Sequence, residues 1–173
     1  MTNSVNISPL KKDDIEELIN LVNTAYRGES SKKGWTTEAD LLDGIRTDKR
    51  SIQALMQKPG AIIFTATNKA NRMVGCVYLL KQGTQLYLGM LTVAPDIQAR
   101  GIGKQLMLAA EKYGREINCT SITMRVIDAR HELIEWYKRK GYQSTGETKP
   151  FPSDPSFGIP KKPLQFIVLE KKI

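Results

Sequence analysis

Residues 88–104 read LGMLTVAPDIQARGIGK and contain, in order, the end of a strand, a turn with glycines and the start of a helix. Apolar and β-branched residues run to Val93, and Pro95 breaks the strand. After the turn at residues 98–103, apolar residues recur every three or four positions, a spacing typical of an amphipathic helix. They are Ile102, Leu106, Ala109, Tyr113 and Ile117. The segment therefore predicts a strand–loop–helix unit.

Two glycines at the start of that helix, Gly101 and Gly103, favour an anion site. Backbone N–H groups at a helix N-terminus attract phosphate, and a residue without Cβ lets the phosphate approach them. Two common nucleotide motifs do not fit this loop. A P-loop needs Ser or Thr where this chain has Gln105, and a dinucleotide fingerprint needs glycine where it has Leu106.

The same periodicities and chain breakers divide the rest of the chain into strands and helices. We expect strands at 5–8, 61–67, 73–81, 85–93, 121–126, 142–147 and 164–170. We expect helices at 13–26, from Thr37 to Ile45, and at 49–57, 102–117 and 132–140. This order predicts an α+β fold with a central, mostly antiparallel sheet. The length and the lack of a linker predict one domain over residues 1–173.

Composition and charge set the broad class of the protein. Hydrophobic residues make up 40% of the chain, and no apolar run approaches the roughly 20 residues of a membrane span. No signal peptide is visible, so we expect a cytoplasmic protein. The net charge of +8 favours an anionic partner such as nucleic acid, a membrane surface or a phosphate-bearing small molecule. Because the charge is spread along the chain without a basic run, we expect neither nucleic acid nor membrane.

Cysteine and histidine content argues against several kinds of site. Cys76 and Cys119 lie beside apolar segments without a metal-binding spacing, so we expect two reduced, partly buried thiols. His131 is the single histidine and cannot form a histidine-based metal site alone. We therefore expect no metal.

Three motifs, taken together, resemble the GNAT superfamily of N-acetyltransferases. Residues 98–103 (QARGIG) match Gln/Arg-x-x-Gly-x-Gly/Ala, the acetyl-CoA pyrophosphate loop of that family. Residues 91–95 (LTVAP) are similar to the end of its fourth strand, and residues 135–142 (EWYKRKGY) to its last helix. The resemblance implies a twisted sheet, splayed between its fourth and fifth strands and flanked by about four helices. It also implies acetyl-CoA as cosubstrate, and it is compatible with a homodimer.

The resemblance also implies a set of cofactor-binding residues. In this family, backbone groups of the fourth strand bind the pantetheine arm, and the N–H of Leu91 is the expected donor to the thioester carbonyl. Loop amides would bind the pyrophosphate, and basic side chains would pair with the phosphates. The implied residues are Leu91, Thr92, Val93, Gln98, Ala99, Arg100, Gly101, Ile102, Gly103, Lys104, Arg130 and Tyr137.

The implied reaction is direct attack of a primary amine on acetyl-CoA in a ternary complex. Tyr137 matches the family's tyrosine at the thiol and is the expected general acid. Tyr87 stands where some relatives place a catalytic glutamate, and a tyrosine of pKa near 10 is a weak base. Glu29 and Glu38 are the alternative bases, and a water-mediated route stays open.

The acceptor is expected to be a small-molecule or peptide amine. Trp35 lies in a polar loop and could hold an ammonium group by cation–π contact. The other expected acceptor-binding residues are Tyr26, Glu38, Tyr87 and Phe151. A CoA-binding sensor of the same fold without turnover is the main alternative, and a nucleic-acid-associated protein is the weaker one.

Overall fold

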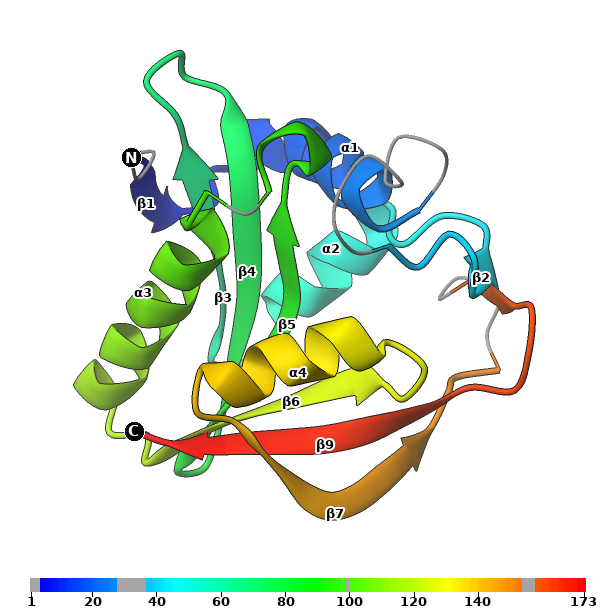
Figure 1. Ribbon diagram of the computed structural model, residues 1–173. Helices are drawn as coiled ribbons and strands as arrows, with labels where there is room; N and C mark the ends of the chain where they lie inside the picture. Colours follow the sequence, from blue (N-terminus) through cyan, green and yellow to red (C-terminus); the bar gives the residue numbers. More distant parts are fainter. Residues whose placement is uncertain (1–3, 28–36, 99, 154–157) are drawn as a thin grey trace.

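A seven-stranded sheet forms the centre of the protein (Figure 1). The structure is a computed structural model and describes residues 4–27, 37–98, 100–153 and 158–173. The strands lie in the order β1-β3-β4-β5-β6-β9-β7, and β5 and β6 are the parallel neighbours. Their bounds are β1 Asn6–Pro9, β3 Ala61–Thr67, β4 Met73–Gln82, β5 Gln85–Val93, β6 Ser121–Ile127, β7 Gln143–Pro150 and β9 Gln165–Lys172. The expected α+β fold with a mostly antiparallel sheet is confirmed.

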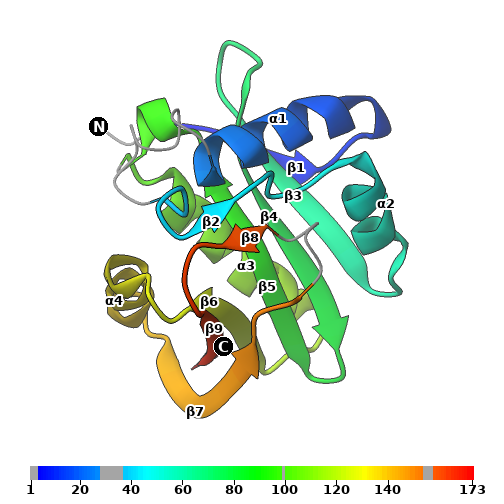
Figure 2. The ribbon, with the colours of Figure 1, turned by 90° about the vertical axis from the view of Figure 1, so that its right-hand side faces the viewer.

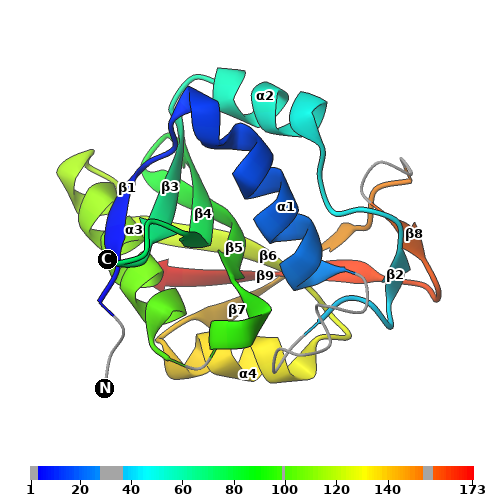
Figure 3. The same ribbon diagram turned by 90° about the horizontal axis from the view of Figure 1, so that it is seen from above.

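In the described residues, four α-helices cover the two faces of the sheet (Figure 3). They are α1 Ile15–Tyr26, α2 Lys49–Gln57, α3 Ile102–Glu116 and α4 His131–Arg139. Leu18 of α1 and Ile52 of α2 are fully buried in the core on one face, and Leu106 of α3 is fully buried in the core on the other. Strand β4 contributes to both cores, which explains its nearly continuous apolar sequence.

Strands β5 and β6 separate after a short parallel contact. They pair only where Gln85–Tyr87 faces Ser121–Thr123. On its other side, β5 shifts register against β4 between Cys76 and Tyr78. Met90 lies in this irregularity with a φ of 54°, which is uncommon for a residue with a side chain. The bulge and the separation confirm the expected splay, because these are the fourth and fifth strands of the expected sheet.

A second, two-stranded sheet joins two distant loops (Figure 2). It pairs β2 (Leu42–Asp43) with β8 (Ile159–Pro160), and the N–H of Lys161 donates to the carbonyl of Leu41 at 2.9 Å. The helix expected from Thr37 to Ile45 is therefore wrong. A single turn does form, because the N–H of Leu42 donates to the carbonyl of Glu38 at 3.0 Å. Pairing with β8 then takes the place of further helical turns.

Of the remaining predicted elements, the helix at 49–57 and the strands at 61–67 and 85–93 have their predicted bounds, and the others differ from the structure only at their ends. Pro9, expected to follow the first strand, is its last residue. Both cysteines are free and buried, as expected. In the described part of the chain, each helix is too short or too polar to cross a bilayer.

Candidate active site

A cavity of about 370 Å³ lies where β5, the start of α3 and α4 meet. We call it the α3–α4 cavity. It is lined by Ala25, Tyr26, Leu91, Thr92, Val93, Gln98, Gly101, Ile102, Gly103, Lys104, Arg130, Leu133, Trp136, Tyr137 and Lys140. Ala99 lies outside the described residues, and Arg100 is exposed and does not line the cavity. The structure brings together all the other residues expected to bind the cofactor.

The N-terminus of α3 faces this cavity. Gly101 precedes the helix in a left-handed conformation, with a φ of 85°, which glycine adopts without steric cost. The first N–H groups of a helix have no partner within the helix, so Ile102, Gly103 and Lys104 offer donors there. An ideal Cβ on Gly103 would lie 3.5 Å from the Trp136 ring, an ordinary contact. Packing alone therefore does not require glycine at position 103, because an alanine would fit there.

After β5 has separated from β6, backbone carbonyls on that side of β5 accept hydrogen bonds from side chains instead of from strand β6. The Tyr26 hydroxyl donates to the carbonyl of Leu91 at 2.5 Å, and Gln98 Nε2 donates to the carbonyl of Val93 at 3.0 Å. Burial raises the pKa of Tyr26 to about 12, so its hydroxyl stays protonated near neutral pH. With β6 turned away, the N–H groups of Leu91 and Val93 have no strand partner on that side among the residues that the structure describes.

Tyr137 extends from α4 into the region where β5 has separated. Its side chain is buried, and its ring meets the rings of Trp136 and Tyr142 edge-on at centroid distances of 5.3 and 6.0 Å. Burial raises the pKa of Tyr137, which makes the hydroxyl a proton donor rather than a phenolate. No hydrogen bond among the described residues engages this hydroxyl. It is therefore available to a ligand.

A second cavity of about 690 Å³ adjoins the first, and we call it the α2 cavity. Residues of α2, β5, β6 and the segment after β7 line it. Five residues line both cavities: Tyr26, Leu91, Arg130, Leu133 and Tyr137. Of the expected acceptor residues, Tyr26, Glu38, Tyr87 and Phe151 line the α2 cavity. Trp35 and Glu29 lie outside the described residues.

Tyr87 lines the α2 cavity as an aromatic wall. Its ring lies edge-on to Tyr78 at 6.4 Å, and the Arg125 guanidinium lies 6.0 Å from its centroid. Burial raises the pKa of Tyr87 above the ordinary value for tyrosine. Phenolate is then scarce at neutral pH, which argues against this side chain as a base.

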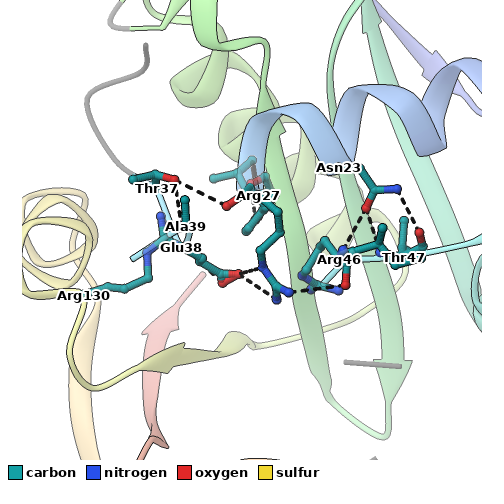
Figure 4. Close-up of polar contacts among 11 residues, drawn as sticks. Asn23, Arg27, Thr37, Glu38, Ala39, Arg46, Thr47 and Arg130 are labelled. Atoms are coloured by element: carbon teal, nitrogen blue, oxygen red, sulfur yellow. Dashed lines mark hydrogen bonds and ion pairs between the residues drawn. The ribbon is translucent and has the colours of Figure 1, made fainter. Parts of the chain in front are cut away.

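Glu38 lies at the centre of a buried cluster of charges (Figure 4). One carboxylate oxygen accepts from Arg27 Nη2 at 3.3 Å, and the other lies 3.8 Å from Arg130 Nη1. All three residues are no more than 6% exposed. Arg27 also donates to the carbonyl of Ile45 at 3.3 Å. Both oxygens of Glu38 are therefore engaged with guanidinium groups that connect α1 to the start of α4.

Gly158 makes room for this cluster beside β8. It has a φ of 106°, and an ideal Cβ would lie 3.2 Å from Arg27 Cζ. We expect Gly158→Ala to lower the free energy of unfolding by about 2 kcal/mol, because it combines backbone strain with a clash against a buried group. Gly83→Ala, also at positive φ but with open space around it, is the matched control for the clash. Urea denaturation measures both, and equal losses would contradict the role given to Arg27.

Sequence analysis missed several residues that line the two cavities. Leu133 and Lys140 lie four positions before and three positions after Tyr137 on the same helix face. Trp136, next to Tyr137, lies three positions after Leu133 and lines the cavity with them. That spacing could have identified them once Tyr137 was assigned. Arg46 and Arg125 line the α2 cavity from a loop and from β6, and no local motif marks them.

Comparison with known proteins identifies the family. A family model described as Acetyltransferase (GNAT) family matches residues 15–142. No curated protein sequence matches the chain. Among solved structures, the ribosomal-protein-S18-alanine N-acetyltransferase of Escherichia coli is 14% identical with a TM-score of 0.72, covering 98% of this chain and 94% of that chain.

Two further structures agree with this fold. A GNAT-family acetyltransferase of Staphylococcus aureus is 18% identical with a TM-score of 0.69, covering 98% of this chain and 99% of that chain. The PaiA N-acetyltransferase of Thermoplasma acidophilum, solved with coenzyme A, is 18% identical with a TM-score of 0.64 and the same coverage. At these identities the structures show the fold alone. The family match covers most of the length of this protein, which therefore belongs to the acetyltransferase (GNAT) family.

Proposed function

We propose that this protein transfers an acetyl group from acetyl-CoA to a primary amine within a ternary complex. The observation that carries the proposal is the junction of the two cavities at Leu91 and Tyr137. A donor bound in the α3–α4 cavity would place its thioester at this junction, and an acceptor in the α2 cavity would reach it from the other side. Two ligands that meet at one point are what direct transfer requires.

The residues present fit acetyl-CoA. The amides at the start of α3, with Lys104 and Lys140 nearby, would hold the pyrophosphate. The free edge of β5 would hold the pantetheine arm, and the N–H of Leu91 would donate to the thioester oxygen as negative charge develops there. Acetyl-CoA supplies an electrophilic acyl carbon in a thioester, whose sulfur can leave as a thiolate.

The transfer requires two proton movements. The amine nitrogen forms a bond to the acyl carbon, the carbon–sulfur bond breaks, and Tyr137 gives its proton to the departing sulfur. The nitrogen loses a proton on the other side of the junction. We propose that Tyr87 and Glu38 shape the acceptor cavity, because one is a neutral phenol and the other is held by two arginines. Glu29 and solvent are the candidate proton acceptors.

Calorimetry with acetyl-CoA, followed by a thiol-release assay with a panel of amines, tests the proposal. We expect binding and amine-dependent release of CoA. Binding without release for any amine would favour a sensor of the same fold. The absence of binding by folded protein would overturn the proposal.

Gly103→Ala tests the phosphate site separately from folding. The new Cβ meets Trp136 at an ordinary distance, and alanine favours the helix over glycine by up to about 1 kcal/mol. We therefore expect an equal or higher melting temperature. The same Cβ stands where a phosphate approaches the backbone, so we expect the Kd for acetyl-CoA to rise about tenfold or more. Unchanged affinity in calorimetry would contradict the phosphate site.

A further inference from the structure

We propose that the amine acceptor also carries an anionic group, a carboxylate or a phosphate, which Arg46 and Arg125 bind in the α2 cavity. The inference rests on the proposed function and adds the chemical class of the acceptor to it. It comes from the charges that line the α2 cavity and from their partners.

Cationic side chains outnumber carboxylates around this cavity. The cations are Arg27, Arg46, Arg50, Lys58, Arg125 and Arg130, and the carboxylates among the described residues are Glu38 and Asp48. Glu38 pairs with Arg27 and Arg130. Asp48 accepts from the N–H of Ser51 at 2.7 Å and caps α2. Asp48 also interacts with the charge of Arg50, and Glu147 of β7, which does not line the cavity, interacts with that of Arg125. Arg46, Lys58 and Arg125 therefore have no matching carboxylate in the described part of the cavity wall.

Two of these three cations, Arg46 and Arg125, lie against tyrosine rings of the cavity wall. The Arg46 guanidinium lies 5.3 Å from the centroid of the Tyr26 ring, and the Tyr26 hydroxyl binds the carbonyl of Leu91. Arg125 lies over the ring of Tyr87. Tyr87 itself lies two positions before Gly89, the residue next to the register shift of β5. Both arginines interact electrostatically with Tyr87, so an anion beside this ring would be attracted by both, in the same cavity that reaches Leu91.

The loop that carries Arg46 is held in place by α1 (Figure 4). Asn23 Oδ1 accepts from the N–H groups of Arg46 and Thr47 at 2.8 and 2.9 Å, and Asn23 Nδ2 donates to the carbonyl of Thr47 at 2.9 Å. The Arg46 side chain is half-buried. A guanidinium on a fixed backbone loses less entropy when it binds a carboxylate or phosphate in a bidentate manner.

Positive charge around the cavity has two consequences for an acceptor. A diamine or a lysine side chain with no negative group meets repulsion, whereas an anionic group gains attraction. Nearby positive charge also lowers the pKa of a bound ammonium group, which increases the fraction of free amine. The second effect favours attack without a strong side-chain base.

The test compares acceptors that differ in the anionic group. β-Alanine is paired with its amide, phosphoethanolamine with ethanolamine, and a diaminoalkane serves as the cationic comparison. We expect kcat/KM to be at least about tenfold higher for the anionic member of one pair or both. The pair with the larger ratio identifies carboxylate or phosphate as the preferred group. Higher or equal kcat/KM for the diamine or for the members without the anionic group in both pairs would overturn the inference.

Arg125→Gln is the variant that tests the assigned anion site, and Arg115→Gln is its matched control. Arg115 is exposed on α3 and lines neither cavity. We expect Arg125→Gln to reduce the preference for the anionic acceptor about tenfold, since it removes a charged donor. The control should retain the preference. Equal preference in the wild type and Arg125→Gln would overturn this assignment.

The outcomes separate this inference from the proposed function. Turnover of the diamine and the neutral amines alone would support acetyl transfer and overturn the anionic acceptor. If no amine is turned over, calorimetry of the CoA-saturated protein with both pairs of acceptors measures the anion site directly. Tighter binding of β-alanine or phosphoethanolamine than of its partner would support the anion site and count against turnover, and equal or absent binding in both pairs would overturn it.

Discussion

Tyr137→Phe is expected to lower kcat about 100-fold and to change the Kd for acetyl-CoA by less than about threefold. The loss is the size usually attributed to one general acid. Phenylalanine keeps the ring contacts with Trp136 and Tyr142, and no hydrogen bond among the described residues is lost with the hydroxyl. Stability should therefore stay within about 0.5 kcal/mol. Steady-state kinetics, calorimetry and urea denaturation measure the three quantities.

Tyr142→Phe is the matched control for this experiment. Tyr142 packs beside Tyr137, is 1% exposed, and has a buried hydroxyl without a hydrogen-bond partner among the described residues. Removing an unsatisfied hydroxyl should leave kcat unchanged and raise stability by up to about 1 kcal/mol. A wild-type kcat in Tyr137→Phe across the pH range would exclude Tyr137 as the acid.

Glu38→Ala is expected to lower the free energy of unfolding by about 3–5 kcal/mol. The substitution leaves Arg27 and Arg130 buried and close together without their shared carboxylate. Burial already lowers the pKa of Arg27, and Glu38 opposes that shift. For a chain of this length the loss corresponds to a fall in Tm of roughly 10 °C. Urea and thermal denaturation measure it.

Glu135→Ala is the control for Glu38→Ala. Glu135 lies on α4 in an exposed pair with Lys138 at 3.5 Å. Exposed pairs contribute at most about 1 kcal/mol, so the control should be close to wild type. A loss below about 1 kcal/mol in Glu38→Ala would mean that the two buried arginines find other partners.

Much of the fold follows from short-range sequence patterns. Several elements have the predicted bounds or differ from them by one residue, because turn residues and apolar periodicity act over a few residues. They are the helices at 49–57 and 102–116 and the strands at 61–67 and 85–93. The segment after Thr37 did not follow its local pattern. One helical turn forms after the capping residue Thr37. The chain then pairs as β2 with β8, a partner far along the chain that a local pattern cannot indicate.

The candidate site likewise contains residues that a local motif predicts and residues that only the packing brings together. The residues proposed to bind the cofactor lie mostly within residues 91–104, where a strand end, a loop and a helix start are consecutive, so the motif alone predicts that they line one cavity. The α2 cavity, proposed to hold the acceptor, combines Arg46 from a loop, Glu38 beside α1 and Arg125 from β6. These residues share no motif, because they meet only through packing and sheet register.

The amino-acid sequence by itself determined an α+β fold with a glycine loop at a helix start, since backbone conformation and apolar spacing are local properties, and the acetyltransferase fold was implied by the resemblance of its motifs to the GNAT family. Only the tertiary structure decided that Glu38 is enclosed by two arginines and that Arg46 and Arg125 face one cavity. The physical reason is that the environment of a charge depends on every segment packed around it, and those segments are distant in the sequence.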